Sequence, residues 1–137
     1  MAGPVEAKLF VSTTGSDADF IVKVIDVLPD PVNTQQLVRA EVIRGKFRNS
    51  FYNPEPFIPE KVTALNLVLN DVAHVFKPGH RIMIQIQSSW FPLVDRNPQV
   101  FTNIATADET DFKKSTIRIH HNQNYPSKIR CTVLPGQ

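Results

Sequence analysis

Residues 18–28 read ADFIVKVIDVL, a stretch in which apolar side chains fall on both faces of an extended strand. Alternate residues of a strand share a face. One face therefore carries Phe20, Val22 and Val24, and the other carries Ile21, Lys23, Ile25 and Val27. Two largely apolar faces are typical of a central strand covered on both sides. Pro29 and Pro31 end the strand, because proline cannot donate a backbone hydrogen bond to a sheet.

A period of two recurs along the rest of the chain and predicts further strands. The additional strands are expected over residues 5–11, 37–43, 61–72, 81–88, 115–121 and 128–134. In the cleanest of them, Ile82, Ile84 and Ile86 are expected to face inward. Residues 107–114 can form one helical turn. About seven strands without a long helix favour an all-β sandwich.

The composition describes one ordinary globular domain. The chain has 137 residues and a net charge of +2, and its charges are interspersed, which argues against a nucleic-acid partner. No apolar run approaches the roughly 20 residues of a membrane helix. The N-terminus lacks the pattern of a signal peptide. The single cysteine, Cys131, gives no sign of an oxidising compartment, so the localisation stays open.

The residues that nucleophilic catalysis requires are not grouped in this sequence. A G-x-S-x-G elbow is missing, and Ser88 and Ser89 stand at a strand end without a neighbouring glycine. Cys131 lies within a predicted strand, where a packed free thiol is the simpler interpretation. We therefore predict no catalytic residue in this chain.

The histidines do not predict a metal site. His120 and His121 are adjacent, so in a strand they point to opposite faces and cannot share an ion. His74 and His80 flank a turn and can converge, but no third ligand is in register. One cysteine cannot build a thiolate site. We predict neither a metal nor a cofactor.

Two long loops, residues 45–59 and 90–101, are unusually rich in aromatic residues and proline. Exposed rings can form a platform for a carbohydrate, or a docking surface, since Trp, Phe and Arg are enriched in interfaces. Alternatively, the second loop folds back to plug the sandwich end, with Asp95 and Arg96 tying it down. The candidate interface residues are Trp90, Phe91, Asp95, Arg96, Asn97, Phe101, Phe51 and Phe57.

Several ordered blocks resemble one protein family. They are residues 16–27, 77–86, 88–92 and 95–97, with residues 44–48 matching the longer members. Together they resemble the C-terminal domain of the cocaine esterase and X-prolyl dipeptidyl peptidase class of serine hydrolases. The longer members are those described as glutaryl-cephalosporanate acylases or α-amino-acid ester hydrolases. The resemblance runs from Val5 to Pro135.

The resemblance implies a jelly-roll β-sandwich of the galactose-binding-like type. It also implies that residues 1–137 form a single C-terminal domain cut from a larger enzyme, whose α/β-hydrolase domain carries a Ser-Asp-His triad. We therefore expect a non-catalytic domain that packs against that catalytic domain. The alternative is a free-standing carbohydrate-binding module. If the loops have lost a partner, the isolated domain is expected to expose apolar surface and can self-associate.

Overall fold

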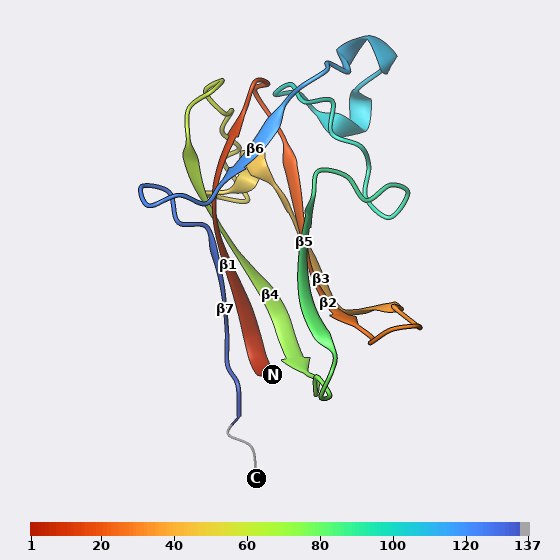
Figure 1. The fold of residues 1–137 in the computed structure, drawn as a ribbon. Helices are drawn as coiled ribbons and strands as arrows, with labels where there is room; N and C mark the ends of the chain where they lie inside the picture. The colour runs from red at the N-terminus through yellow and green to blue at the C-terminus, as the bar shows by residue number, and fades with distance from the viewer. Residues whose placement is uncertain (135–137) are drawn as a thin grey trace.

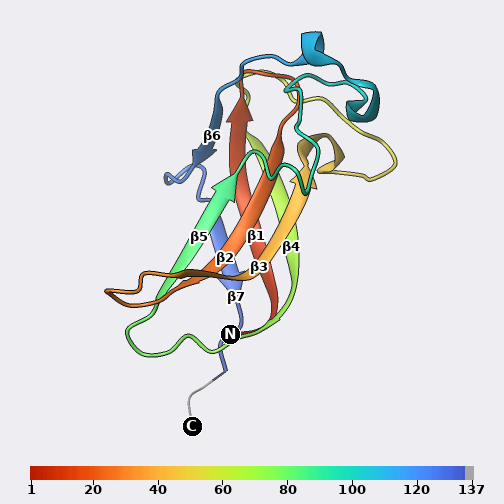
Figure 2. The ribbon, with the colours of Figure 1, turned by 90° about the vertical axis from the view of Figure 1, so that its right-hand side faces the viewer.

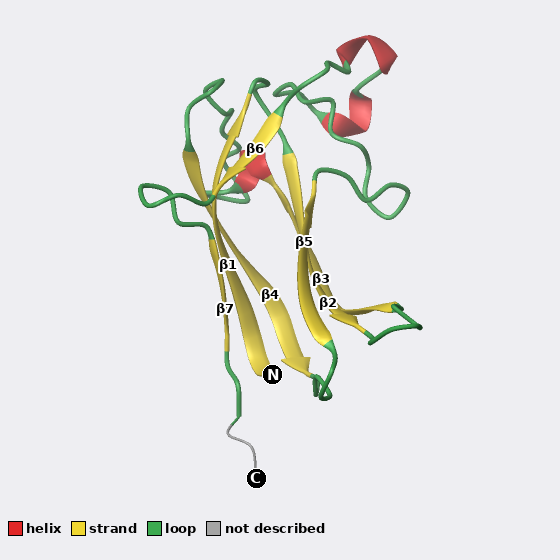
Figure 3. Cartoon of the chain, in the orientation of Figure 1, coloured by secondary structure: helices red, strands yellow, loops and turns green. Residues whose placement is uncertain are grey.

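The computed structural model describes residues 1–134, which form two antiparallel sheets packed face to face (Figure 1). The strands are β1 (Ala2–Thr13), β2 (Asp19–Val27), β3 (Gln35–Arg44), β4 (Thr63–Ala73), β5 (Arg81–Gln87), β6 (Ile117–His120) and β7 (Lys128–Cys131). The helical turns among these residues are η1 (Gly45–Phe47), η2 (Ile104–Thr106) and η3 (Glu109–Asp111). Figure 3 shows these turns lying among the loops, outside the two sheets. The expected all-β, jelly-roll β-sandwich is confirmed.

Each sheet is built around one strand that is hydrogen-bonded to neighbouring strands along both of its edges. In the first sheet β1 pairs with β4 on one side, while β7 and β6 pair with successive parts of its other side. In the second sheet β2 lies between β3 and β5. Every residue of β2 is buried except Lys23, which is half-buried. The central position predicted for residues 18–28 is therefore correct.

The core lies between the two sheets and is made by the inward side chains of the longest strands. Alternation along β1 and β4 places one apolar side chain in two on the inner face, as a strand period of two requires. The buried set from these strands and β2 consists of Val5, Ala7, Leu9, Val11, Phe20, Val22, Val24, Leu65, Leu67, Leu69 and Val72. Phe57 enters this core from the first long loop and meets Phe20 edge-on, with ring centroids 6.3 Å apart.

Two local predictions concern the helical turn over residues 107–114 and the orientation of Ile82. The helical turn expected over residues 107–114 exists as η3, where Asp108 and Asp111 form a capping box. Ile82 lies on the same inward face of β5 as Ile84 and Ile86, which pack against the core, but Ile82 is 56% exposed. It lies opposite Asp26 near the start of β5, at an end of the sandwich that no other strand covers.

The described residues end just before the C-terminus of the expected domain. Pro135, where the family resemblance ends, lies outside them. Within residues 1–134, no helix has the length and apolarity needed to cross a membrane.

Candidate functional site

Two long loops meet at the end of the sandwich that is remote from both ends of the described residues (Figure 2). The first loop (residues 45–59) follows β3, and the second loop (residues 90–101) follows β5. Both are fastened to the turn between β1 and β2. In that turn the Ser16 carbonyl accepts a hydrogen bond from the Phe57 amide at 2.8 Å, and the Ser16 amide donates to the Gln99 carbonyl at 3.2 Å. One short turn thus supports both loops.

Two glycines allow this close contact between backbones. A Cβ added to Gly15 would lie 2.2 Å from the Gln99 carbonyl oxygen in the second loop. A Cβ added to Gly45 would lie 2.3 Å from the Phe57 ring and 2.5 Å from the Ala18 carbonyl oxygen. Side-chain carbons do not approach other atoms so closely in folded proteins, so both positions require glycine.

Asn97 anchors the second loop to the two carboxylates at the start of β2. Its Nδ2 donates to Asp17 Oδ2 at 3.1 Å and to Asp19 Oδ1 at 2.8 Å. The Lys46 backbone amide donates to Asp17 Oδ1, and Arg44 Nη1 donates to Asp19 Oδ2, both at 3.1 Å. Asp17 is fully buried, and Asp19 and Asn97 are 2% and 6% exposed. A buried polar network with its members bonded fixes one arrangement of the loop.

The electrostatics of this network follow from its burial. Burial raises the pKa of Asp17, although the hydrogen bond from Asn97 offsets part of the rise. Burial likewise raises the pKa of Asp19 to about 6, against the Asn97 hydrogen bond and the charge of Arg44. Burial thus makes the ionised form of both carboxyl groups costly, and the interactions with Asn97, Arg44 and Lys46 limit that cost.

The predicted interface residues separate into an exposed group and an internal group. Exposed fractions are 63% for Phe91, 42% for Phe101 and 80% for Phe51, and Asp95 and Arg96 are also exposed. Trp90 is half-buried. Phe57 is only 2% exposed and Asn97 only 6%, so both act inside the domain and cannot present a side chain to a partner. We therefore retain the other six as surface candidates.

Cations cover part of the aromatic surface. Lys23 Nζ lies 4.0 Å from the centroid of the Trp90 ring and thus covers one of its faces. The Arg96 guanidinium lies 5.7 Å from the Phe91 ring and 5.2 Å from the Phe112 ring. In residues 1–134 neither Asp95 nor Arg96 forms an ion pair, so Asn97, rather than those two residues, ties down the loop.

The two histidines beside the β4–β5 connection do converge, but on a carboxylate that the sequence analysis did not connect with them. His74 Nε2 and His80 Nδ1 each lie 2.8 Å from an oxygen of Asp26, which is 2% exposed. Burial raises the pKa of Asp26, but the two histidine hydrogen bonds outweigh it and hold that pKa below its usual range. The signal available in the sequence was the position of Asp26 on the strand face that otherwise carries Phe20, Val22 and Val24.

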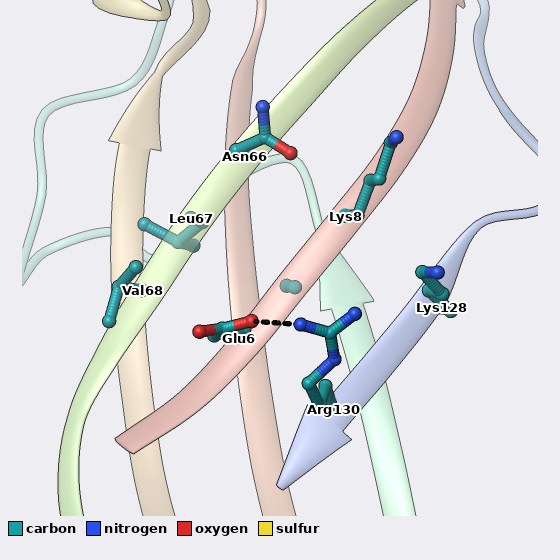
Figure 4. Close-up of a pocket in the computed structure, with 8 residues that line it drawn as sticks. Glu6, Lys8, Asn66, Leu67, Val68, Lys128 and Arg130 are labelled. Atoms are coloured by element: carbon teal, nitrogen blue, oxygen red, sulfur yellow. Dashed lines mark hydrogen bonds and ion pairs between the residues drawn. The ribbon is translucent and has the colours of Figure 1, made fainter.

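A hollow also lies on the outer face of the first sheet (Figure 4). Its volume is about 340 Å³, and Lys8, Lys128 and Arg130 lie along it. The only carboxylate among the residues shown in Figure 4 is that of Glu6, which pairs with Arg130 at 3.3 Å. Both side chains of this pair are exposed. An open, solvated hollow with one surface ion pair offers no activated group for catalysis.

The described residues contain no assembled catalytic or metal centre. Ser88 and Ser89 are exposed, and no hydrogen bond within residues 1–134 joins either to a histidine or a carboxylate. No three His, Cys, Asp or Glu side chains among these residues are grouped to hold a metal ion. What the arrangement offers instead is a firmly anchored, partly aromatic surface.

Comparison with protein families identifies one matching family model. Residues 1–130 match the X-Pro dipeptidyl-peptidase C-terminal non-catalytic domain. The chain is also 34% identical over 135 residues to a cocaine esterase from Rhodococcus sp. (strain MB1 Bresler). That match covers 98% of this chain but only 23% of the esterase.

Solved structures with the same fold include two enzymes. An aminopeptidase from a marine-sediment Thaumarchaeota archaeon is 47% identical, with a TM-score of 0.89, over 93% of this chain and 22% of its own. An alpha-amino acid ester hydrolase is 39% identical, with a TM-score of 0.88 and the same two coverages. The chain thus spans less than a quarter of the length of each of these relatives.

Proposed function

The chain belongs to the family of X-Pro dipeptidyl-peptidase C-terminal non-catalytic domains, and from that premise we propose that it braces the α/β-hydrolase domain of a longer serine hydrolase. The observation that carries the proposal is the contrast within the second loop. The loop is held by the buried hydrogen bond from Asn97 to Asp19 and by the Phe101 amide, which donates to Ser16 Oγ at 2.9 Å. Phe91 and Phe101 nevertheless project with 63% and 42% of their surface exposed. A rigid support beneath exposed rings lowers the entropy cost of docking, as a preformed contact surface requires.

The surface extends from the second loop to the first. Phe101 lines a shallow apolar hollow together with Phe47 and Pro54 of the first loop. Phe51 and Tyr52, next to Pro54 in the chain, are 80% and 93% exposed. Aromatic side chains gathered on a surface are enriched at protein interfaces. Both loops are therefore assigned to the contact with the catalytic domain.

The names of the relatives support an esterase or peptidase as the longer protein. One relative is an aminopeptidase, one an ester hydrolase and one a cocaine esterase. In this proposal the present chain supplies no group to bond cleavage, and its contribution to activity is the stability and position of the catalytic domain.

The test compares the same substitutions in two contexts. Phe91→Ser combined with Phe101→Ser is made in residues 1–137 alone and in the protein expressed from its complete reading frame. In residues 1–137 the effect on the free energy of unfolding is expected to stay within about 0.5 kcal/mol, because both rings already face solvent. In the complete protein the double variant is expected to lower both the melting temperature and the turnover of an ester or peptide substrate.

A matched control is Val68→Ser, at a residue of β4 that is 61% exposed and belongs to neither loop. This control is expected to leave the free energy of unfolding of residues 1–137 unchanged, and also the melting temperature and turnover of the complete protein. If the double variant and the unmodified complete protein had equal melting temperatures and equal turnover, the result would contradict the proposal.

A carbohydrate-binding module is the second candidate, and one observation weighs against it. A stacking platform needs an open ring face, whereas Lys23 covers a face of the half-buried Trp90. Calorimetric titration of residues 1–137 with a panel of soluble glycans distinguishes the two functions. No heat of binding is expected, and saturable binding that Phe91→Ser abolishes would favour the module instead.

A further inference from the structure

An apolar groove opens at the opposite end of the sandwich, where both ends of the described chain lie (Figure 1). Its volume is about 690 Å³, and its walls are largely aliphatic and aromatic. Val75, Ile82 and Val133 line it with exposed fractions of 77%, 56% and 70%. These exposed aliphatic side chains form one apolar patch, and apolar patches of this kind mark contact sites.

The groove exists because the sandwich is closed along one side only. On the closed side Asn70 of β4 donates a hydrogen bond to Glu41 of β3 at 3.2 Å. On the other side, within residues 1–134, β5 pairs only with β2 and β7 pairs only with β1. The groove lies between these two edge strands, with Ile82 on one wall and Cys131 on the other.

The first residue of the chain lies in this groove and already takes part in a strand ladder. Ala2 pairs with Ala73 in the antiparallel register of β1 and β4. One step further, the Met1 nitrogen donates to the His74 carbonyl at 2.9 Å, and the His74 amide donates to the Met1 carbonyl at 3.1 Å. A residue placed before Met1 on the same ladder would run alongside Val75, at the mouth of the groove.

We propose that, in the complete protein, the polypeptide preceding residue 1 continues β1 alongside residues 75–76 and buries apolar side chains in this groove. The inference rests on the proposed function, since it requires a longer chain. In this family the matched domain is C-terminal, and in the relatives more than three quarters of the chain lies outside the match. A segment joined covalently at Met1 has a high effective concentration at the groove, so even a weak contact is populated.

The experiment adds the native upstream residues and follows the groove directly. Residues 1–137 are compared with the same chain carrying about twelve of its own preceding residues, enough for a strand of about 40 Å at about 3.3 Å per residue. Cys131 is the only cysteine of residues 1–137, is half-buried and lines the groove, so its alkylation by iodoacetamide reports on occupancy. Mass spectrometry of the Cys131 peptide gives the rate, and hydrogen exchange reports on the backbone of residues 75–76.

The upstream residues are expected to slow alkylation of Cys131 at least about fivefold and to protect residues 75–76 from hydrogen exchange. Both effects follow if the docked state of the upstream segment is more populated than the open state. Val75→Ser with Ile82→Gln is expected to reverse most of that protection. The matched control Val32→Ser, at a residue 61% exposed in the β2–β3 loop, is expected to leave the protection intact. Because Val75, Ile82 and Val32 are already largely exposed, neither the double substitution nor the control threatens the fold.

Three outcomes would overturn the inference. They are unchanged alkylation and exchange on adding the upstream residues, protection that grows with protein concentration and so indicates a second copy in the groove, and a native reading frame that begins at Met1. The first two would leave the loop proposal intact, because Phe91 and Phe101 lie at the other end of the sandwich. Conversely, if Phe91→Ser with Phe101→Ser changed neither melting temperature nor turnover, the alkylation rate of Cys131 would still test the groove independently.

Discussion

Removing the amide of Asn97 is expected to destabilise the domain more than its loop position suggests. Asn97→Ala deletes the hydrogen bonds to Asp17 and Asp19, at 3.1 and 2.8 Å, and leaves both buried carboxylates without that donor. Each hydrogen bond to a charged group contributes about 1.5–3 kcal/mol, so the free energy of unfolding should fall by about 3–6 kcal/mol at pH 7.5. That is a large part of the about 5–15 kcal/mol that stabilises an ordinary domain.

The size of the loss should depend on pH, and the sign follows from the raised pKa of Asp19. With a pKa of about 6, folded Asp19 takes up a proton at pH values where an unfolded aspartate is still ionised. The free energy of unfolding of the unmodified protein therefore gains from this group as the pH falls from 7.5 to 5. Asn97 stabilises the ionised form, so its removal costs less once the carboxyl group is protonated. We expect the loss from Asn97→Ala to shrink by about half at pH 5.

Urea unfolding followed by circular dichroism at the two pH values measures both effects. At a denaturant dependence of about 2 kcal/mol per molar urea, a loss of about 4 kcal/mol lowers the midpoint by roughly 2 M. Asn66→Ala is the control, because Asn66 is exposed on the outer face of β4 and should change stability by less than about 0.5 kcal/mol. A loss below about 1 kcal/mol for Asn97→Ala, or an equal loss at both pH values, would refute the reasoning.

Three further outcomes are expected. Gly45→Ala should lower the free energy of unfolding by about 2–4 kcal/mol in thermal melts, since its Cβ would meet the Phe57 ring at 2.3 Å; a variant as stable as the parent would contradict the close packing. Asp26→Asn should lessen the loss of stability on acidification, because the lowered pKa of Asp26 stabilises the folded state at higher pH and that stabilisation disappears as the pH falls through the folded pKa. An equal acid-induced fall in the free energy of unfolding for variant and parent would count against this. Leu9→Ala, at a core residue 1% exposed, should cost about 3–5 kcal/mol by chemical denaturation, and a loss under about 1 kcal/mol would mean the core collapses around the gap.

The strands could be predicted because their signal is local. Residues 18–28 carry apolar side chains on both faces, and the structure places β2 at the centre of its sheet with Lys23 as its least buried residue. The exposure of Ile82 could not be predicted, because alternation within β5 gives the face of a side chain but not where the opposing sheet ends. Periodicity therefore predicts layers better than it predicts their edges.

The polar contacts could not be predicted, because they join residues remote in sequence. Asn97 lies 80 residues from Asp17, and Asp26 lies 48 residues from His74. The sequence analysis noted the loop around Asn97 for its aromatic residues, whereas the buried amide is what holds the loop. Phe57 was likewise grouped with exposed rings, because a loop phenylalanine that folds into the core has the same local pattern as one that does not.

The shared attachment of both long loops to the β1–β2 turn has a practical consequence for redesign. A change in the length of that turn, between Thr13 and Asp19, would displace two surfaces together, because the Ser16 backbone is hydrogen-bonded to Phe57 of the first loop and to Gln99 of the second. Residues 49–54 and 91–95, by contrast, lie beyond the hydrogen bonds that fasten the loops to it. A library intended to refit this end of the domain to a different neighbour should vary those two segments jointly and leave the turn and its glycine unchanged.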